Sequence, residues 1–309
     1  MKTPRDIPSW AYAVAVVLTT VAYGASYVVI KDAMEAVATS WLLAMRFGLA
    51  ALVLGVAFRR RIARTIDLSH MLAGVVVGLP EALGFLLQNL GLTQTSPGRN
   101  AFLTATYCVM VPFLAWAVER RRPGASNVVA AVMCLTGVGL LSLTGRQSLS
   151  LGAGDWLTLF SALMYASNMV AVGRLGRAHD AVCLTFLMLV TCALVCMGWA
   201  VALEPAPLAS AFTAEFAAQL AYITIATTVV GLLVQNVAQR HLPSSEVALL
   251  LSFESVFAAV FSVAFYGEKI TPSLLAGFAL IFGAVLVSQF APGRRQADEL
   301  RAEAREGRP

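Results

Sequence analysis

The chain has 309 residues, of which 59% are hydrophobic and 13% charged, with a mean hydropathy of +0.76 and a formal net charge of +5 at pH 7. Roughly a quarter of the residues of a soluble domain are charged, so this composition excludes an ordinary soluble protein. The net positive charge follows from an uneven distribution of Arg and Lys, described below, and does not indicate nucleic-acid binding.

Ten apolar stretches follow one another along the chain, each close to the ~20 residues that a helix needs to cross a bilayer. They are far longer than barrel strands, and an open sheet edge in lipid would leave backbone groups unpaired, so helices are predicted. The predicted spans are 10–30, 40–58, 70–92, 98–118, 126–143, 152–173, 180–203, 213–236, 243–265 and 272–290. The first stretch exceeds a signal-peptide core and nine more follow it, so we expect it to be retained.

Basic residues are distributed unequally between the two sides of the membrane that these spans would cross. With a cytoplasmic N-terminus, most fall inside: Lys2, Arg5, Arg59, Arg60, Arg61, Arg64, Arg120, Arg121, Arg122, Arg174, Arg177, Arg240, Arg294, Arg295, Arg301, Arg305 and Arg308. Four fall outside: Lys31, Arg99, Arg146 and Lys269. This asymmetry follows the positive-inside rule and predicts that both termini are cytoplasmic.

The ten spans form two sets of five, and corresponding spans of the two sets share short sequence motifs. Gln88-Asn89 ends the third span and Gln235-Asn236 ends the eighth. In the fifth and tenth spans Gly137, Leu140 and Ser142 correspond to Gly283, Leu286 and Ser288. Because five is odd, the second copy enters the membrane from the opposite side, as in the inverted repeats of many carriers. We predict an all-α integral membrane protein with a first repeat at 1–148, a second at 149–291 and a charged, solvated tail at 292–309.

Polar side chains follow single faces of six spans, at spacings of three and four residues. In chain order these faces carry Thr20, Tyr23, Tyr27 and Lys31; Gly74, Gly78, Glu81, Phe85 and Gln88; Asn100, Thr104 and Tyr107; Ser161, Tyr165 and Asn168; Thr224, Thr228, Gly231 and Gln235; and Glu254 with Phe257, Ala258 and Phe261. Spans one, three and four thus pair with six, eight and nine. Since polar groups in lipid must face protein or water, we predict that these six helices surround a central cavity and that the other four are scaffold.

Two carboxylates of these faces lie deep in the bilayer. Glu81 and Glu254 are each eleven residues from the cytoplasmic end of their span, hence roughly 16 Å deep, near the midplane. A charge there is costly, so each is either a substrate or proton site or a structural acid, with Arg46 as a candidate partner. Arg46 itself, about six residues from the outer end of the second span, is expected as an interface anchor or ion-pair partner rather than a substrate clamp.

The remaining expected site residues follow from the same faces. Tyr23, Tyr27, Tyr107 and Tyr165 suit either helix packing or a cavity for flat side chains. Gln88, Asn100 and Gln235 lie toward the mouths and are candidate gate residues, whereas the binding centre is expected between the two glutamates. Pro80 and Pro112 are expected to kink their helices there, and the Gly74/Gly78 pair is a weak indication of close packing.

Several segments resemble the EamA family of the drug/metabolite transporter superfamily. In the first half, residues 23–27 with Lys31 resemble the opening "WGsn…K" segment, Arg46-Phe47 resembles the second-helix arginine, and 111–119 resembles the "P…E" stretch. In the second half, 154–156 resembles the "GD" helix entry, and 253–258 with 267–268 resembles "EPvfa…lGE". Ser255 stands where that last motif has proline. The resemblance extends from Trp10 to Phe290.

The resemblance implies a ten-helix inner-membrane carrier with both termini in the cytoplasm, working by alternating access. It also implies a cavity lined by helices one, three, four, six, eight and nine, and metabolite export, with aromatic amino acids among the family's cargoes. We therefore expect an exporter of a small metabolite, with no cofactor, no metal site and no nucleic-acid partner.

Other functions remain as alternatives. A membrane channel would need rings of like charge or a filter loop, and a membrane enzyme would need a motif such as HExxH or GxSxG; the sequence has none of these. A proton-coupled importer stays open, because Glu81 and Glu254 could carry protons. Without a phosphate loop, any driving force is a gradient.

Overall fold

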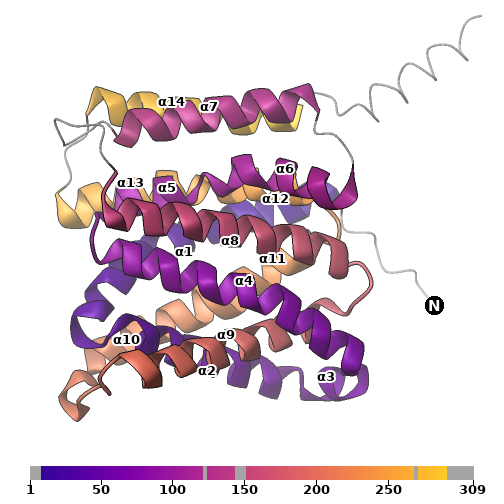
Figure 1. The fold of residues 1–309 in the computed structure, drawn as a ribbon, viewed down its shortest axis with the longest axis vertical. Helices are drawn as coiled ribbons and strands as arrows, with labels where there is room; N and C mark the ends of the chain where they lie inside the picture. The colour runs from indigo at the N-terminus through magenta and orange to yellow at the C-terminus, as the bar shows by residue number, and fades with distance from the viewer. Residues whose placement is uncertain (1–7, 121–123, 143–150, 268–270, 291–309) are drawn as a thin grey trace, which may run out of the picture.

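The computed structural model describes residues 8–120, 124–142, 151–267 and 271–290, and within these ranges it consists of helices and short connections (Figure 1). The helices are α1 (Ser9–Ala36), α2 (Thr39–Ala57), α3 (Arg59–Thr65), α4 (Leu68–Leu92), α5 (Pro97–Thr104), α6 (Tyr107–Glu119), α7 (Ala125–Ser142), α8 (Ala153–Leu175), α9 (Ala181–Leu203), the 3₁₀ turn η1 (Ala209–Ala211), α10 (Ala214–Tyr222), the π-helix η2 (Ile223–Gly231), α11 (Leu232–Ala238), α12 (Ser244–Leu251), α13 (Phe253–Tyr266) and α14 (Pro272–Phe290). The predicted fourth and ninth spans are each two helices, and the eighth is α10, η2 and α11.

Eight segments of the described chain are long and apolar enough to cross a membrane. They are Ser9–Ala36, Thr39–Ala57, Leu68–Leu92, Pro97–Val118, Ala153–Leu175, Ala181–Leu203, Ala214–Ala238 and Ser244–Tyr266. The helices of the fifth and tenth predicted spans, α7 and α14, contain shorter apolar stretches, Ala125–Gly137 and Leu275–Ala284. The all-helical prediction is therefore confirmed for the described residues, whereas the count of ten spans is not and remains a prediction.

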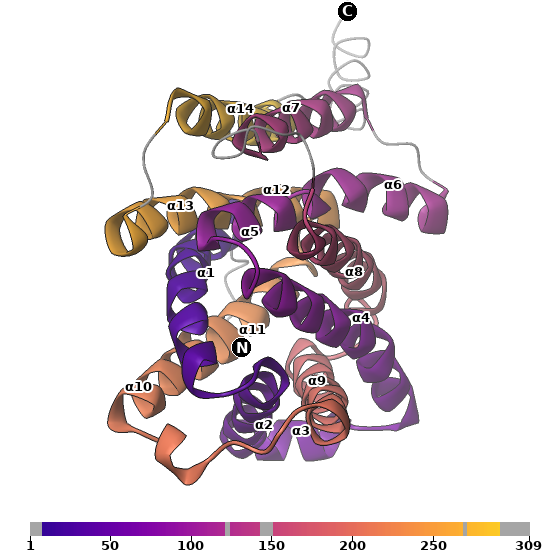
Figure 2. The same ribbon diagram turned by 60° about the vertical axis from the view of Figure 1, so that its left-hand side comes forward.

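α7 and α14 pack against each other as a separate layer on one side of the bundle, visible in both Figure 1 and Figure 2. α7 contacts α5 and α6, and α14 contacts α12 and α13, so the pair rests on the two broken spans. The rest of the bundle packs mainly across the halves: α1 lies against α13, α4 against α8 and α9, and α2 against α9. The interior is therefore an interface between the two repeats.

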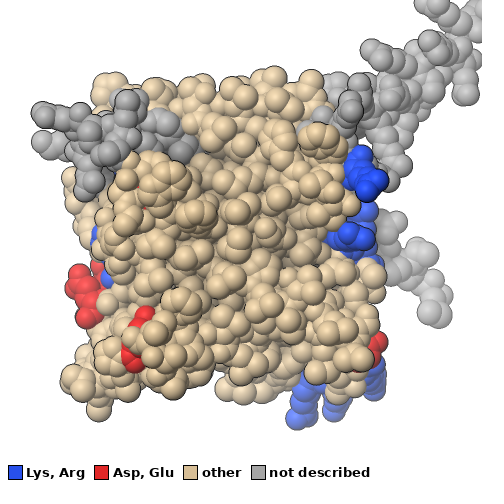
Figure 3. Space-filling view, in the orientation of Figure 1, with Lys and Arg blue, Asp and Glu red and all other residues tan. Residues whose placement is uncertain are grey.

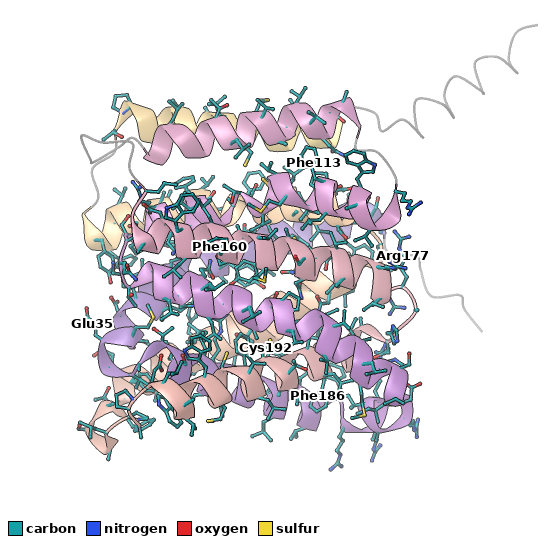
Figure 4. All side chains as sticks on the ribbon, viewed as in Figure 1. Glu35, Phe113, Phe160, Arg177, Phe186 and Cys192 are labelled. Atoms are coloured by element: carbon teal, nitrogen blue, oxygen red, sulfur yellow. The ribbon has the colours of Figure 1, made fainter. Side chains whose placement is uncertain are left out.

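On the face of the molecule shown in Figure 3, charged side chains lie mainly toward the two ends of the helices. Lys and Arg gather mainly at the right-hand edge of Figure 3 and Asp and Glu mainly at the left-hand edge, with a broad face free of charge between them. Arg177 and Glu35 mark these opposite ends in Figure 4. We call them the basic end, with Arg59, Arg60, Arg61, Arg64, Arg174 and Arg177, and the acidic end, with Asp32, Glu35, Glu204 and Glu215. Lys2, Arg5, Arg121, Arg122, Arg146, Lys269 and the tail 292–309 lie outside the described residues.

Spans four and nine are interrupted at equivalent positions. Between α5 and α6 the Thr106 hydroxyl donates to the Leu103 carbonyl oxygen (2.7 Å), and between α12 and α13 the Ser252 hydroxyl donates to the Leu249 carbonyl oxygen (2.6 Å). Hydroxyls that hydrogen-bond the preceding turn compete with the helical ladder, and the backbone tightens to three-residue bonds at both breaks. The ninth span is thus broken at Ser252 although Ser255 replaces the expected proline.

The prolines are not where the helices are interrupted. α4 runs continuously through Pro80, and α6 runs continuously through Pro112. The largest irregularity in the described part of the eighth span, the π-helix η2, contains no proline at all. The interruptions of these spans therefore lie at hydroxyl side chains and at a π-helical segment, and kinks at Pro80 and Pro112 stay a prediction.

Glycines allow α4 to approach α9 closely. A Cβ on Gly74 would lie 2.4 Å from the Leu187 Cβ, and one on Gly78 would lie 2.5 Å from the Thr191 Cβ. Figure 4 labels Cys192 in the interior near this contact, and its thiol donates to the Gly78 carbonyl oxygen at 3.5 Å. The Gly74/Gly78 pair thus has the packing role expected for two small residues one turn apart.

At the basic end, two histidines join α4 to the connection between α8 and α9. The backbone N–H of Asp180 donates to His70 Nε2 (3.2 Å), so the other ring nitrogen of His70 carries the hydrogen donated to Asp67 Oδ1 (2.8 Å). Likewise His179 Nδ1 donates to the Leu175 carbonyl oxygen (2.8 Å), and its Nε2 accepts from the Ser69 hydroxyl (2.9 Å). Both ring nitrogens of each histidine thus have a hydrogen-bond partner.

We expect Asp67→Ala to lower the melting temperature of the purified protein at pH 7. Asp67 caps α4, and the hydrogen bonds from the backbone N–H and the ring of His70 hold the pKa of its carboxyl below the ordinary value. A lowered pKa means that the stabilisation is complete above about pH 4 and is lost as the pH falls through the folded-state pKa. Melting curves from pH 7 to pH 3 check this: the difference between wild type and variant should shrink on acidification, and a constant difference would contradict it.

Candidate functional site

A cavity lies at the interface between the two repeats. About 630 Å³ within it is not filled by atoms, and part of this space is open solvent. Its wall is built by α1, α2, α4, α6, α8, α11, α12 and α13. All six spans predicted to surround a cavity contribute, because polar faces in a membrane bundle turn toward protein or water. The second span was assigned to the scaffold, and this was wrong in one respect: its Arg46 lies in the wall.

Most of the predicted site residues lie in this wall. They are Tyr23, Tyr27, Arg46, Glu81, Phe85, Gln88, Tyr107, Tyr165, Asn168, Gln235 and Glu254. The other three, Asn100, Thr104 and Thr228, are buried directly behind it. Asn100 Nδ2 donates to the Gln88 carbonyl oxygen (3.1 Å), and Thr104 and Thr228 accept from Gln88 and Arg46.

The wall also contains residues that were not among the predicted site residues, among them Ser26, Asn89, Leu92, Met169, Leu232 and Leu251. Ser26, Asn89 and Met169 each adjoin a predicted residue in the chain, so they widen the predicted faces by one position. The apolar residues of the wall could not be predicted from the sequence, since leucine occurs on both the lipid-facing and the interior faces of a membrane span.

Gln88 joins four helices. Its Nε2 donates to the Tyr27 hydroxyl (2.7 Å) and to the Thr104 hydroxyl (3.0 Å), and its Oε1 accepts from the Tyr165 hydroxyl (2.7 Å). Tyr27 in turn donates to Glu254 Oε1 at 3.4 Å. These contacts connect α1, α4, α5 and α8 with α13, and they use both N–H hydrogens and one lone pair of the Gln88 amide. Gln88 is thus part of the central network, and a gate role for Gln88, Asn100 and Gln235 remains a prediction.

Glu81 and Glu254 face the cavity from opposite repeats, one on α4 and the other in the first turn of α13. Glu81 is only 2% exposed, and its Oε2 has no hydrogen-bond partner. Arg46, its predicted partner, binds two threonines instead, and no ion pair joins the two side chains. The interpretation of Glu81 as a structural ion-pair partner of Arg46 is therefore not supported by a direct contact.

Arg46 points into the bundle and does not reach the membrane interface. It is 1% exposed, its Nε and Nη2 donate to the hydroxyls of Thr228 and Thr227 on η2, and its Cζ lies 4.7 Å from the centre of the Phe85 ring. The expectation of an interface anchor was wrong. Snorkelling requires the side chain to leave the helix on the lipid side, whereas this face of α2 packs against the cavity.

Aromatic rings form one continuous part of the wall. Phe85 meets Tyr165 edge to face, with ring centres 5.3 Å apart, and Tyr165 meets Tyr107 in the same way at 6.5 Å. Phe47 supports Phe85 from behind at 5.1 Å. Such edge-to-face contacts hold each ring in place while leaving other ring faces for a ligand.

The two repeats also touch at both ends of the bundle. At the acidic end Arg99 pairs with Asp155 (2.8 Å), the Tyr266 hydroxyl donates to Asp32, and the Ser40 hydroxyl donates to Glu204 (2.8 Å). At the basic end Arg61 pairs with Asp180 at 2.6 Å. Polar contacts near the ends of the apolar spans thus join the halves on either side of the cavity.

Comparisons with known proteins agree with this architecture. The EamA-like transporter family matches the chain twice, over residues 10–143 and 152–289. An "Uncharacterized transporter" from Archaeoglobus fulgidus is 27% identical over 276 residues, covering 87% of this chain and 83% of the relative. A solved structure described as "Crystal structure of protein" has a TM-score of 0.73 at 15% identity, over 90% of this chain and 96% of that one, and thus shares the fold.

Long apolar helices and two matched transporter segments define a multi-pass membrane transporter. The chain belongs to the EamA-like transporter family, with two copies of the family domain.

Proposed function

We propose that this protein is a secondary carrier that exports a small metabolite, such as an amino acid and in particular an aromatic one, by alternating access. The cavity between the repeats carries this proposal: it combines unpartnered polar atoms with an aromatic wall, and both halves of the chain build it. A site shared by two related halves can face either side as the halves move against each other. The contacts at the acidic and basic ends would then break in turn.

The proposed setting is the inner (plasma) membrane, with the basic end and both termini in the cytoplasm. The gathering of arginines at one end of the described helices supports this orientation. Glu81 and Glu254 make a proton the candidate coupling ion. A channel or a proton-coupled importer would use the same cavity differently.

The test is flux in proteoliposomes against a panel of metabolites that includes the aromatic amino acids. We expect saturable transport of at least one of them, faster when the pH gradient favours the export direction. No saturable transport of any compound by folded protein would refute the carrier. Currents far above carrier turnover under voltage clamp would indicate a channel instead. The same panel in a thermal-shift assay finds the ligand independently, since a compound that binds only the folded form raises the melting temperature.

A further inference from the structure

Arg46 is a buried cation without a carboxylate partner. A guanidinium has five N–H donors. Two nitrogens, Nε and Nη2, donate to threonine hydroxyls, whereas Nη1 is buried in the cavity wall with no hydrogen-bond partner. An unpaired charge inside a membrane bundle is costly and in general marks a functional site. The free Nη1 therefore indicates an anionic group that is bound only when the site is loaded.

The π-helix explains how this guanidinium is held. In η2 the hydroxyls of Thr227 and Thr228 both donate to the Ile223 carbonyl oxygen, at 2.6 and 2.7 Å. An α-helix would turn neighbouring residues about 100° apart, but the wider π turn lets both hydroxyls reach one carbonyl. Because the only hydrogen of each hydroxyl is donated to the Ile223 carbonyl oxygen, each hydroxyl oxygen acts as the acceptor of an N–H of Arg46. The two threonines thus orient the cation without neutralising it.

A group of the opposite kind lies in the same cavity. Glu81 Oε2 has no partner and, like Arg46, belongs to the cavity wall. Phe85 follows Glu81 by one turn of α4, and the guanidinium lies over its ring. Further along the wall, the rings of Tyr165 and Tyr107 continue from Phe85. One site therefore offers a free cationic donor, a free carboxylate oxygen and flat apolar surfaces.

We propose that Arg46 binds the carboxylate of the transported compound, that Thr227 and Thr228 position it, and that Glu81 receives the compound's ammonium group. The substrate is then a small zwitterion with an aromatic or other flat side chain. This inference rests on the proposed carrier function and deepens it, because it names the charges that the substrate must carry and the residues that recognise them.

The test uses three probes that share one ring: phenylalanine, phenylethylamine, which lacks the carboxylate, and phenylpropionate, which lacks the ammonium. Binding to the purified full-length protein is measured by calorimetry or thermal shift. We expect phenylalanine to bind at least about tenfold more tightly than either truncated probe, since each leaves one buried charged group unpaired. Equal affinity for phenylalanine and phenylethylamine, or no binding of phenylalanine to folded protein, would overturn the proposal.

Variants assign the residues. Arg46→Gln should weaken phenylalanine and phenylpropionate about tenfold or more and leave phenylethylamine unchanged, while Glu81→Gln should weaken phenylalanine and phenylethylamine and leave phenylpropionate unchanged. Thr227→Val should weaken the carboxylate probes, and Thr227→Ser, which keeps the hydroxyl, should restore them. A uniform loss for all three probes in Arg46→Gln would overturn the assignment.

Folding defects and failure of the carrier function are separable from this result. Thr227→Val replaces only the buried hydroxyl by a methyl group, and Thr227→Ser keeps the hydroxyl and loses only the methyl group, so this pair keeps the test valid if Arg46→Gln does not fold. If the probe pattern holds but proteoliposomes show no flux, the recognition stands and the carrier function falls. If flux is saturable but binding ignores the carboxylate, the carrier stands and the role of Arg46 falls.

Discussion

Glu254→Gln is expected to reduce saturable flux on the order of tenfold, corresponding to about 1.4 kcal/mol of lost interaction. Glu254 lies in the first turn of α13, directly after the break at Ser252, where the helix N-terminus favours a negative charge. It accepts from Tyr27 of the other repeat, which itself accepts from Gln88. Glutamine keeps the size of the side chain but removes its charge and its capacity to carry a proton.

The matched control is Tyr23→Phe. The Tyr23 hydroxyl is buried with no hydrogen-bond partner, so its removal breaks no bond in the network. Initial rates are measured in proteoliposomes with and without a pH gradient, and proton coupling predicts that Glu254→Gln abolishes the response to the gradient while Tyr23→Phe retains it. Equal and negligible losses in both variants would remove this carboxylate from the mechanism.

Gly24→Ala is expected to destabilise the protein by about 1–3 kcal/mol, the usual cost of overpacking a well-filled interface. Gly24 lies where α1 crosses α13, and a Cβ there would be 2.5 Å from the Phe257 Cβ and 2.7 Å from the Ala258 backbone nitrogen. Because one of these atoms is backbone, the two helices must separate. They carry Tyr27 and Glu254, so flux should fall together with stability.

Gly48→Ala on α2 provides the comparison, because a Cβ at that position has nothing within 4 Å. Without a clash, the better helix propensity of alanine should stabilise the protein by up to about 1 kcal/mol. Unfolding of both variants in the same detergent measures the contrast. A Gly24→Ala protein as stable as Gly48→Ala would show that α1 and α13 are not held at this distance.

The polarity pattern predicted the cavity wall well because it depends on a local rule. In lipid, a helix face with Glu81, Phe85 and Gln88 must turn toward protein, and three- and four-residue spacing shows which positions share that face. The same rule placed Tyr165 and Asn168 in the wall. It could not locate Arg46, since a single polar residue in an apolar helix has no periodicity that distinguishes the interface from the interior.

The sequence by itself determined the membrane class, the family, the doubling of the chain and the six polar helix faces, because hydropathy and helical period act within a single span. Only the tertiary structure decided that Gln88 is the centre of a network, that Arg46 is left with a free donor, and that η2 turns Thr227 and Thr228 toward it. These features depend on which atoms of different helices meet. The extra residue of the π turn and the breaks at Thr106 and Ser252 arise from hydroxyl contacts and packing that no single-span pattern records.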